Sequence, residues 1–170
     1  YLDIYFLPSQ PQYGWACSQD SGYVVRTTNG GQTWMGSRVV QSGFCHLEYI
    51  QFLNTQVGYC TGPCGVYKST DGGASWFELN LGYPDSMVWG GWFKDEYEGW
   101  ATGGSCGVNN FYHTTDGGTS WERFRDTTVK RSNMSDPLWQ GDMPAGTVYA
   151  VGNGTLWKST NSGSTWSPDS

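Results

Sequence analysis

The chain has 170 residues, of which 37% are hydrophobic, 16% aromatic and only 14% charged, and 25 of them are glycine. Its net charge of -6 and pI near 4.6 argue against a nucleic-acid backbone or an anionic membrane as partner, because both require clustered Lys and Arg. No window offers the roughly 18–20 apolar residues of a transmembrane helix, and no helical period is sustained, so the composition indicates an all-β, turn-rich protein that is not membrane-embedded.

The first predicted strands lie at residues 3–7, 13–18 and 23–27, and an outer strand starts at residue 33. The next group is the cleanest, with strands at 47–53, 57–61, 65–69 and 75–79. A third group has an inner strand around Trp92 and an insertion at 103–110 between its second and third strands. The polar run 125–133 precedes a fourth group. Such insertions often carry binding contacts, although a solvated loop without a partner is the alternative.

Each group contains an octet that ends in Trp, and these tryptophans fall at 34, 76, 121 and 166, with spacings of 42, 45 and 45. Asn-Gly or Asp-Gly inside an octet predicts a tight hairpin turn, because Gly accepts positive φ. The opening Ser or Thr and the Asp or Asn two residues later are predicted to accept backbone hydrogen bonds, and the Trp indole is free to reach a carbonyl. The octet residues predicted to form these turns are Thr27, Asn29, Gly31 and Trp34; Ser69, Asp71, Gly73 and Trp76; Thr114, Asp116, Gly118 and Trp121; and Ser159, Asn161, Gly163 and Trp166.

A second landmark repeats in step with the octets: Gly14-Trp15, Gly58-Tyr59, Gly99-Trp100 and, with Val for Gly, Val148-Tyr149. A period near 45 residues is typical of four-stranded propeller blades. We therefore predict an all-β fold, a β-propeller of four-stranded antiparallel blades spanning residues 1–170 as a domain or a segment of one. The blades are expected at about 1–43, 44–85, 86–133 and 134–170, either as a four-bladed ring or as part of a larger propeller.

The octets resemble the Asp-box, or BNR repeat, Ser/Thr-x-Asp-x-Gly-x-Thr/Ser-Trp. This pattern recurs in sialidases, other glycoside hydrolases, the sortilin ectodomain and the photosystem II assembly factors with their bacterial secreted relatives. The resemblance implies propeller blades, with the box at the blade periphery away from a ligand face. Asp71 and Asp116 are therefore interpreted as structural rather than catalytic carboxylates.

Five cysteines, an odd number, suggest an exported protein, secreted or at the cell surface. The spacing of Cys60 and Cys64 predicts a disulfide across a three-residue hairpin loop. The pairing of Cys17, Cys45 and Cys106 stays open, and a Cys17–Cys45 bridge between blades is one alternative. The cysteine spacing does not match a zinc site, and His46 and His113 are the only histidines, so neither a metal nor another cofactor is predicted.

Catalytic motifs are missing from the sequence. No spacing selects a pair of carboxylates for glycoside hydrolysis, and no phosphate-binding loop or hydrolase elbow appears. A binding face is predicted where propeller loops gather, and its candidate residues are Asp20, Asn109, Asn110, Tyr83, Lys130 and Arg131. We interpret Trp92 and Trp100 primarily as core between blades.

The function expected from these observations is a non-catalytic, exported propeller module for protein–protein association or scaffolding. A carbohydrate-binding or sialidase-like glycoside hydrolase fragment is the first alternative, and an assembly-factor-like module for a membrane complex is the second. The partner, protein or glycan, is not identified by the sequence, and self-assembly or incorporation in a larger chain is compatible with it.

Overall fold

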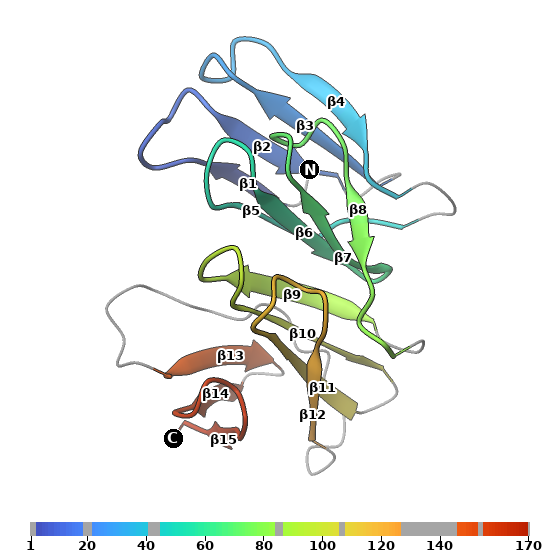
Figure 1. Cartoon of the computed structure of the whole chain (residues 1–170), viewed down its shortest axis with the longest axis vertical. Coiled ribbons are helices and arrows are strands. Elements are labelled where there is room, and N and C mark those ends of the chain that lie inside the picture. The colour runs from blue at the N-terminus through green and yellow to red at the C-terminus, as the bar shows by residue number, and fades with distance from the viewer. Residues whose placement is uncertain are drawn as a thin grey trace. The chain divides into compact units, whose positions relative to one another are not determined.

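A computed structural model describes residues 3–18, 22–40, 45–83, 87–105, 108–126, 146–152 and 155–169 (Figure 1). The chain divides into two compact units, Tyr1–Leu79 and Asn80–Ser170. Every described regular element is a β-strand, and every described strand pairing is antiparallel, which confirms the all-β prediction.

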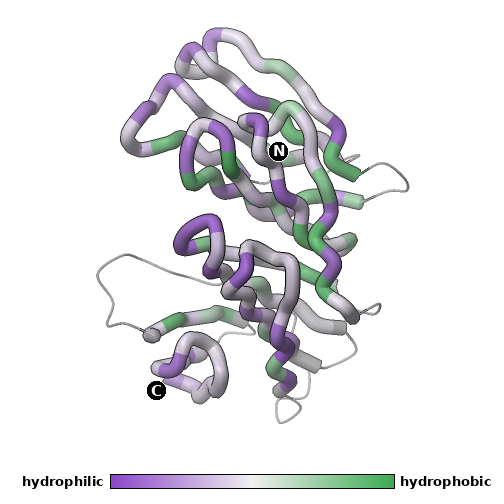
Figure 2. The backbone as a smooth tube through the Cα atoms, in the orientation of Figure 1, coloured by the Kyte–Doolittle hydropathy of each residue, from purple (hydrophilic) through white to green (hydrophobic). Residues whose placement is uncertain are grey.

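The first unit contains two four-stranded sheets, each formed by four strands in chain order. The strands of the first sheet are β1 (Asp3–Phe6), β2 (Gly14–Cys17), β3 (Tyr23–Thr27) and β4 (Met35–Arg38). The strands of the second sheet are β5 (Tyr49–Phe52), β6 (Gly58–Gly62), β7 (Gly65–Ser69) and β8 (Phe77–Leu79). The turns 8–13 and 28–33 are largely hydrophilic, whereas hydrophobic residues recur along the strands (Figure 2).

The second unit contains a four-stranded sheet followed by a sheet with three described strands. The strands of the third sheet are β9 (Val88–Phe93), β10 (Gly99–Ser105), β11 (Val108–Thr114) and β12 (Glu122–Asp126). Those of the fourth sheet are β13 (Val148–Gly152), β14 (Thr155–Ser159) and β15 (Ser167–Pro168). Residues 127–145, which precede the fourth sheet, lie outside the described part of the chain.

Each landmark glycine in the first three sheets lies under a phenylalanine ring of the preceding strand. Gly14 is paired with Phe6, Gly58 with Phe52 and Gly99 with Phe93. A Cβ atom built on Gly14 or Gly58 would lie 2.5 Å from the facing ring, and one on Gly99 would also collide with its Phe. The landmark therefore requires Gly because the ring occupies the space that a side chain would fill.

Successive residues of a strand point to opposite sides of its sheet, so every sheet has two faces, which we call the first face and the second face. The second face carries the landmark aromatic, such as Trp15, and the first face carries the residues that alternate with it. In the first unit, Ile50 and Phe52 on the first face of the second sheet are buried in one cluster with Trp15 and Val24 on the second face of the first sheet. This cluster is the core that joins the two sheets.

The segment 103–110 is not the loop that we predicted. Strands β10 and β11 continue through it, with Gly103 paired to Asn110 and Ser105 to Val108. The strands extend because Gly103 has no side chain to obstruct the backbone of β9: a Cβ there would collide with the carbonyl of Met87. That same carbonyl accepts a hydrogen bond from Gly104 N–H at 3.0 Å.

The predicted Cys60–Cys64 disulfide is wrong, and the bridge joins Cys45 to Cys64. The reason lies in the register of the hairpin. Gly62 pairs with Gly65, so the turn contains only two residues, and Cys60 faces Tyr67 across the strands instead of Cys64.

Cys17 and Cys60 are buried free thiols, so a Cys17–Cys45 bridge is also excluded. Burial raises the pKa of Cys17 to about 12, and it raises the pKa of Cys60 well above its usual range. Both thiols therefore behave as small apolar core groups. Cys106 lies outside the described residues.

Candidate functional site

Each octet forms a turn that satisfies its own polar groups. In the third octet, Thr114 Oγ1 donates to Asp116 Oδ1 at 2.9 Å and accepts from Gly118 N–H at 2.9 Å. Asp116 Oδ1 also accepts from Ser120 N–H at 2.9 Å. Equivalent bonds form in the octets 27–34, 69–76 and 159–166. The recurring carboxylates and amides therefore act as acceptors for their own turn.

These hydrogen bonds keep both octet carboxylates ionised. Bonds from the side chain and the backbone of Ser120 are the main cause that lowers the pKa of Asp116 to about 2. Partial burial acts to raise the pKa of Asp71, but the bonds from Ser75 and Ser69 outweigh it and place that pKa below its usual range. A general acid needs a raised pKa, so this environment opposes that role for both residues.

The octet is also attached to the start of the landmark strand in its own sheet. The N–H of the fourth octet residue donates to the carbonyl of the residue two positions before the landmark. The four bonds run from Gly30 to Gln12, Gly72 to Gln56, Gly117 to Tyr97 and Ser162 to Gly146, at 2.9, 2.8, 2.8 and 2.7 Å. The two sequence landmarks therefore repeat in step because they form opposite ends of one hydrogen-bonded corner.

The closing tryptophan of an octet usually completes the turn. In three octets its indole N–H donates to the carbonyl of the fifth residue, Gly31, Gly118 or Gly163. In the second octet, Trp76 instead donates to Ser37 Oγ at 3.3 Å, and Ser37 donates to the Gly73 carbonyl at 2.6 Å. A hydroxyl from the neighbouring sheet is thus inserted into the second turn.

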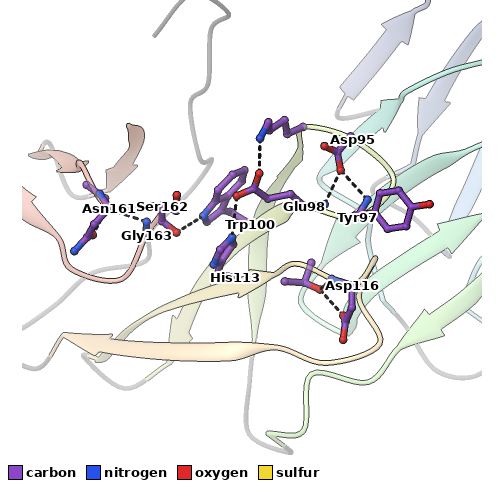
Figure 3. Close-up of polar contacts among 12 residues, drawn as sticks. Asp95, Tyr97, Glu98, Trp100, His113, Asp116, Asn161, Ser162 and Gly163 are labelled. Carbon is purple, nitrogen blue, oxygen red and sulfur yellow. Dashed lines mark hydrogen bonds and ion pairs between the residues drawn. The ribbon is translucent and has the colours of Figure 1, made fainter. Parts of the chain in front are cut away.

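The landmark tryptophans connect one sheet to the octet of the next. Trp15 Nε1 donates to the Gly72 carbonyl at 2.8 Å, and Trp100 Nε1 donates to the Ser162 carbonyl at 2.9 Å (Figure 3). Gly72 and Ser162 occupy the same fourth position of their octets. The same connector therefore operates once inside each unit.

A basic side chain lies opposite each landmark aromatic. The register pairs Trp15 with Arg26, Tyr59 with Lys68, Trp100 with His113 and Tyr149 with Lys158. Lys68 and Lys158 lie 5.2 and 5.5 Å from the centres of their partner rings. Arg26 Nη1 reaches the carbonyls of Asp71 and Gly72, each at 3.3 Å. Arg26 therefore binds the same octet as its aromatic partner, Trp15.

His113 occupies the corresponding position in the third sheet. Its ring stacks on Trp100 with centroids 4.8 Å apart. Trp92 stacks on the other side of Trp100, with those two centroids 5.4 Å apart. His113 Nε2 is buried without a hydrogen bond, although it lies 3.4 Å from Glu98 Oε1. A protonated His113 would form an ion pair there.

A short turn holds Glu98 beside this stack. Asp95 Oδ1 accepts from the N–H groups of Tyr97 and Glu98 at 2.8 and 2.7 Å, and Lys94 binds the Glu98 carboxylate (Figure 3). Hydrogen bonds from these N–H groups lower the pKa of Asp95. The Glu98 carboxylate therefore binds Lys94 through one oxygen, and its other oxygen lies beside the imidazole of His113.

The predicted binding face is only partly described. Asp20, Lys130 and Arg131 lie outside the described residues, as does the side chain of Asn109. Asn110 lies in β11 and is buried, with its Oδ1 unbonded, so it does not offer the exposed loop contact that we predicted. The structure does not bring these candidates together as one described site.

Tyr83, the remaining predicted binding residue, contacts its own unit. The guanidinium of Arg123 lies 3.8 Å from the centre of the Tyr83 ring, and the Tyr112 ring lies 6.0 Å away. Tyr83 is half-buried by these contacts. Arg–Tyr stacking of this kind orders a surface side chain and leaves only part of the ring for a partner.

The pairing of each landmark aromatic with a basic side chain was not predicted from the sequence. Their signal was present, because a Lys, Arg or His immediately precedes every octet: Arg26, Lys68, His113 and Lys158. Glu98 had no comparable signal, since only the folded turn places it beside His113.

Within the described residues there is no group of three or more His, Cys, Asp or Glu side chains that could hold a metal ion. The described part of the chain also holds no helix with the length and apolar character that crossing a bilayer requires.

Comparison with solved structures assigns the fold. The chain is similar to an ancestral GH74 enzyme, with a TM-score of 0.80 and 20% identity over 97% of this chain and 23% of that one. The GH74 enzyme of Niastella koreensis is similar with a TM-score of 0.76 and 15% identity over 98% of this chain and 29% of that one. YCF48 from Cyanidioschyzon merolae is similar with a TM-score of 0.68 and 19% identity over 98% of this chain and 55% of that one. All are β-propellers, and this chain has the same blade-based fold.

The chain spans only about a quarter of the length of the two GH74 enzymes. A structure of YCF48 bound to D1 peptide is also similar, with a TM-score of 0.58 and 16% identity over 98% of this chain and 85% of that one. No protein-family model and no curated protein sequence matches the chain.

Proposed function

We propose that this chain is a non-catalytic propeller module for protein association, exported from the cell, and that its four octets are Asp-boxes. The observation that carries the proposal is the use of the recurring carboxylates. Both oxygens of Asp71 and Asp116 accept hydrogen bonds from their own turn, including short bonds from Ser75 and Ser120 at 2.5 and 2.6 Å. Carboxylates engaged in this way support the fold and are not free to act on a substrate.

The preferred partner is an extended peptide of neutral or basic character. A net charge of -6 favours such a partner over an acidic one. Exposed apolar side chains, among them Tyr97, Phe77 and Met87, resemble in composition the residues that anchor protein interfaces. The similarity to YCF48, which has been captured with a D1 peptide, supports a peptide over a sugar.

Export is supported by the Cys45–Cys64 disulfide, because such bonds persist in oxidising compartments. We expect the native protein to be secreted or displayed on the cell surface. Isolation under thiol-blocking conditions tests this: a protein recovered from its native compartment with Cys45 and Cys64 reduced would contradict export.

The binding proposal is tested with an array of synthetic peptides that varies net charge and aromatic content. Asp116→Asn is the matched variant, because Asn occupies the equivalent position in the first and fourth octets: its Oδ1 accepts the same backbone bond, and its Nδ2 donates to the hydroxyl from which the Asp oxygen accepts. We expect selective binding of neutral or basic peptides, unchanged in the variant. Absence of binding to every peptide, together with glycoside turnover, would overturn the proposal.

A glycoside hydrolase fragment is the second candidate, favoured by the similarity in fold to GH74 enzymes. Reducing-sugar release from xyloglucan, the substrate class named for a GH74 xyloglucanase of similar fold, tests it directly. Turnover that is lost in Asp116→Asn or Asp71→Asn would establish catalysis by the octets, which their hydrogen bonds argue against. An assembly-factor role would instead appear as co-purification with a membrane complex.

A further inference from the structure

The Cys45–Cys64 disulfide joins one buried cysteine to one exposed cysteine. Cys45 is 3% exposed and belongs to the core cluster of the first unit. Cys64 is an exposed residue of the two-residue turn between β6 and β7, where Gly62 pairs with Gly65. A molecule that approaches the bridge from solvent therefore meets Cys64 first.

Contacts other than the bridge fix the segment that carries Cys45. Leu47 is fully buried, and its N–H donates to the carbonyl of Ser18 at 3.1 Å. The N–H of Glu48 donates to the carbonyl of Thr61, near the end of β6, at 2.8 Å. These contacts hold Cys45 beside the turn independently of the disulfide.

The buried thiols of the first unit do not exchange with the bridge. Cys17 and Cys60 are each 0% exposed, and burial raises the pKa of both thiols. Thiolates, and not thiols, attack disulfides, so these two groups stay unreactive while the chain is folded. A thiolate that attacks the bridge of the folded unit must therefore come from solvent.

A carboxylate lies next to the exposed cysteine. Glu78 is exposed on β8, and its Oε1 lies 3.4 Å from a Cβ position on Gly65, the residue that follows Cys64. A negative charge there repels an attacking thiolate that carries further negative charge, and it attracts one that carries an ammonium group. The net charge of -6 on the whole chain acts in the same direction.

We propose that Cys64 is a site of thiol–disulfide exchange, at which a small thiol of cationic or neutral character forms a mixed disulfide with this chain. The attacking sulfur bonds to Cys64 Sγ, the Cys45–Cys64 bond breaks, and its electron pair leaves with Cys45 Sγ. Cys45 then takes a proton, because a buried sulfur favours the neutral thiol. One thiol and one disulfide react to give one of each, so the step needs no further oxidant or reductant.

The same geometry makes the exchange reversible. Because the backbone contacts of Leu47 and Glu48 hold the freed Cys45 beside the turn, its thiolate can attack Cys64 again and expel the small thiol. The inference does not depend on the proposed peptide-binding function, and the Cys45–Cys64 bridge remains the stable form in an oxidising compartment.

Mass spectrometry identifies the sulfur that is attacked. Residues 1–170 are mixed briefly with cysteamine and quenched with acid, and free thiols are blocked with N-ethylmaleimide before digestion. We expect the cysteamine adduct on Cys64 and the blocked thiol on Cys45. The same reaction in guanidinium chloride exposes both sulfurs and should give adducts on both. An adduct on Cys45 of the folded chain, no adduct at all, or the same preference in the denatured chain would each overturn the proposal.

Thiols of different charge test the role of Glu78. The exchange rates with cysteamine and with 2-mercaptoethanesulfonate are compared, each per concentration of thiolate. Glu78→Gln should lower the ratio of these rates about threefold, because it removes one charge within a Debye length of the attacked sulfur. Asp71→Asn is the matched control, since it removes the same charge beyond the opposite end of β7, where Asn stands in the first and fourth octets. The control should leave the ratio unchanged. Equal changes in both variants, or no change in Glu78→Gln, would refute the preference for a cationic or neutral thiol.

Discussion

Trp15→Phe tests whether the landmark tryptophan connects the two sheets of the first unit. Trp15 is 1% exposed, donates its indole N–H to the Gly72 carbonyl and stacks on Phe52. Phe retains the stack but has no donor and a smaller ring. The change therefore isolates the hydrogen bond and the second ring of the indole.

The expected cost follows from these two losses. An intramolecular hydrogen bond contributes about 1 kcal/mol, and Arg26 remains to bind the same carbonyl, so the full penalty of an unpaired group does not apply. The missing ring surface, roughly 40 Å² at about 25 cal/mol per Å², adds about 1 kcal/mol. We expect the free energy of unfolding of this unit to fall by about 2 kcal/mol, before any cavity term.

Urea unfolding followed by far-UV circular dichroism measures the loss. Trp34→Phe is the matched control, because Trp34 is 37% exposed and its indole N–H donates to the Gly31 carbonyl within its own turn. The control should cost less than about 1 kcal/mol. If both variants lose the same stability, the connector between sheets does not have the role assigned to it.

Further changes test the turns and the disulfide. The pKa of Asp116 is about 2 in the folded chain, below its usual 3.8, so its contribution to stability is present above pH 3.8 and is lost as the pH falls toward 2; Asp116→Asn should flatten the acid limb of a pH–stability curve, and an unchanged limb would contradict this. Ser162 has a φ of 56°, so Ser162→Gly should raise the thermal midpoint through a gain of about 0.5 kcal/mol. Gly163→Ala should lower the midpoint, because its φ is 87° and the new Cβ would lie 2.9 Å from Trp100 Nε1; the same direction of change in both variants would refute the assignment. Reduction of Cys45–Cys64, which closes a 19-residue separation, should cost about 3 kcal/mol in urea unfolding, and Cys45→Ser should show the same loss.

The sequence was informative about the turns because their chemistry is local. Thr114, Asp116 and Gly118 lie within five residues, so their hydrogen bonds and the positive φ of Gly118 depend on neighbours in the chain. The strand positions could be predicted from the same turn residues, because these mark where each strand ends. The segment 103–110 was misassigned because its glycines, read as a loop, in fact allow β10 to approach the carbonyl of Met87, the residue just before β9.

The cysteines show where local reasoning fails. A spacing of four residues places Cys60 and Cys64 near each other, but the two-residue turn at Pro63 and Cys64 points Cys60 into the core. Cys45 reaches Cys64 from the segment before β5, across a distance in sequence that spacing alone does not constrain.

The repeated octets and landmarks by themselves determined the fold class, since each specifies one turn and one strand pair through neighbouring residues. Only the tertiary structure decided which face of each sheet is covered. Ile4 and Ile50 have the same sequence context and pattern, yet one is exposed and the other is buried. The difference arises because burial depends on the presence of a neighbouring sheet, and the fixed register of Trp15 and Arg26 on that neighbour supplies the contacts that cover Ile50 and Phe52.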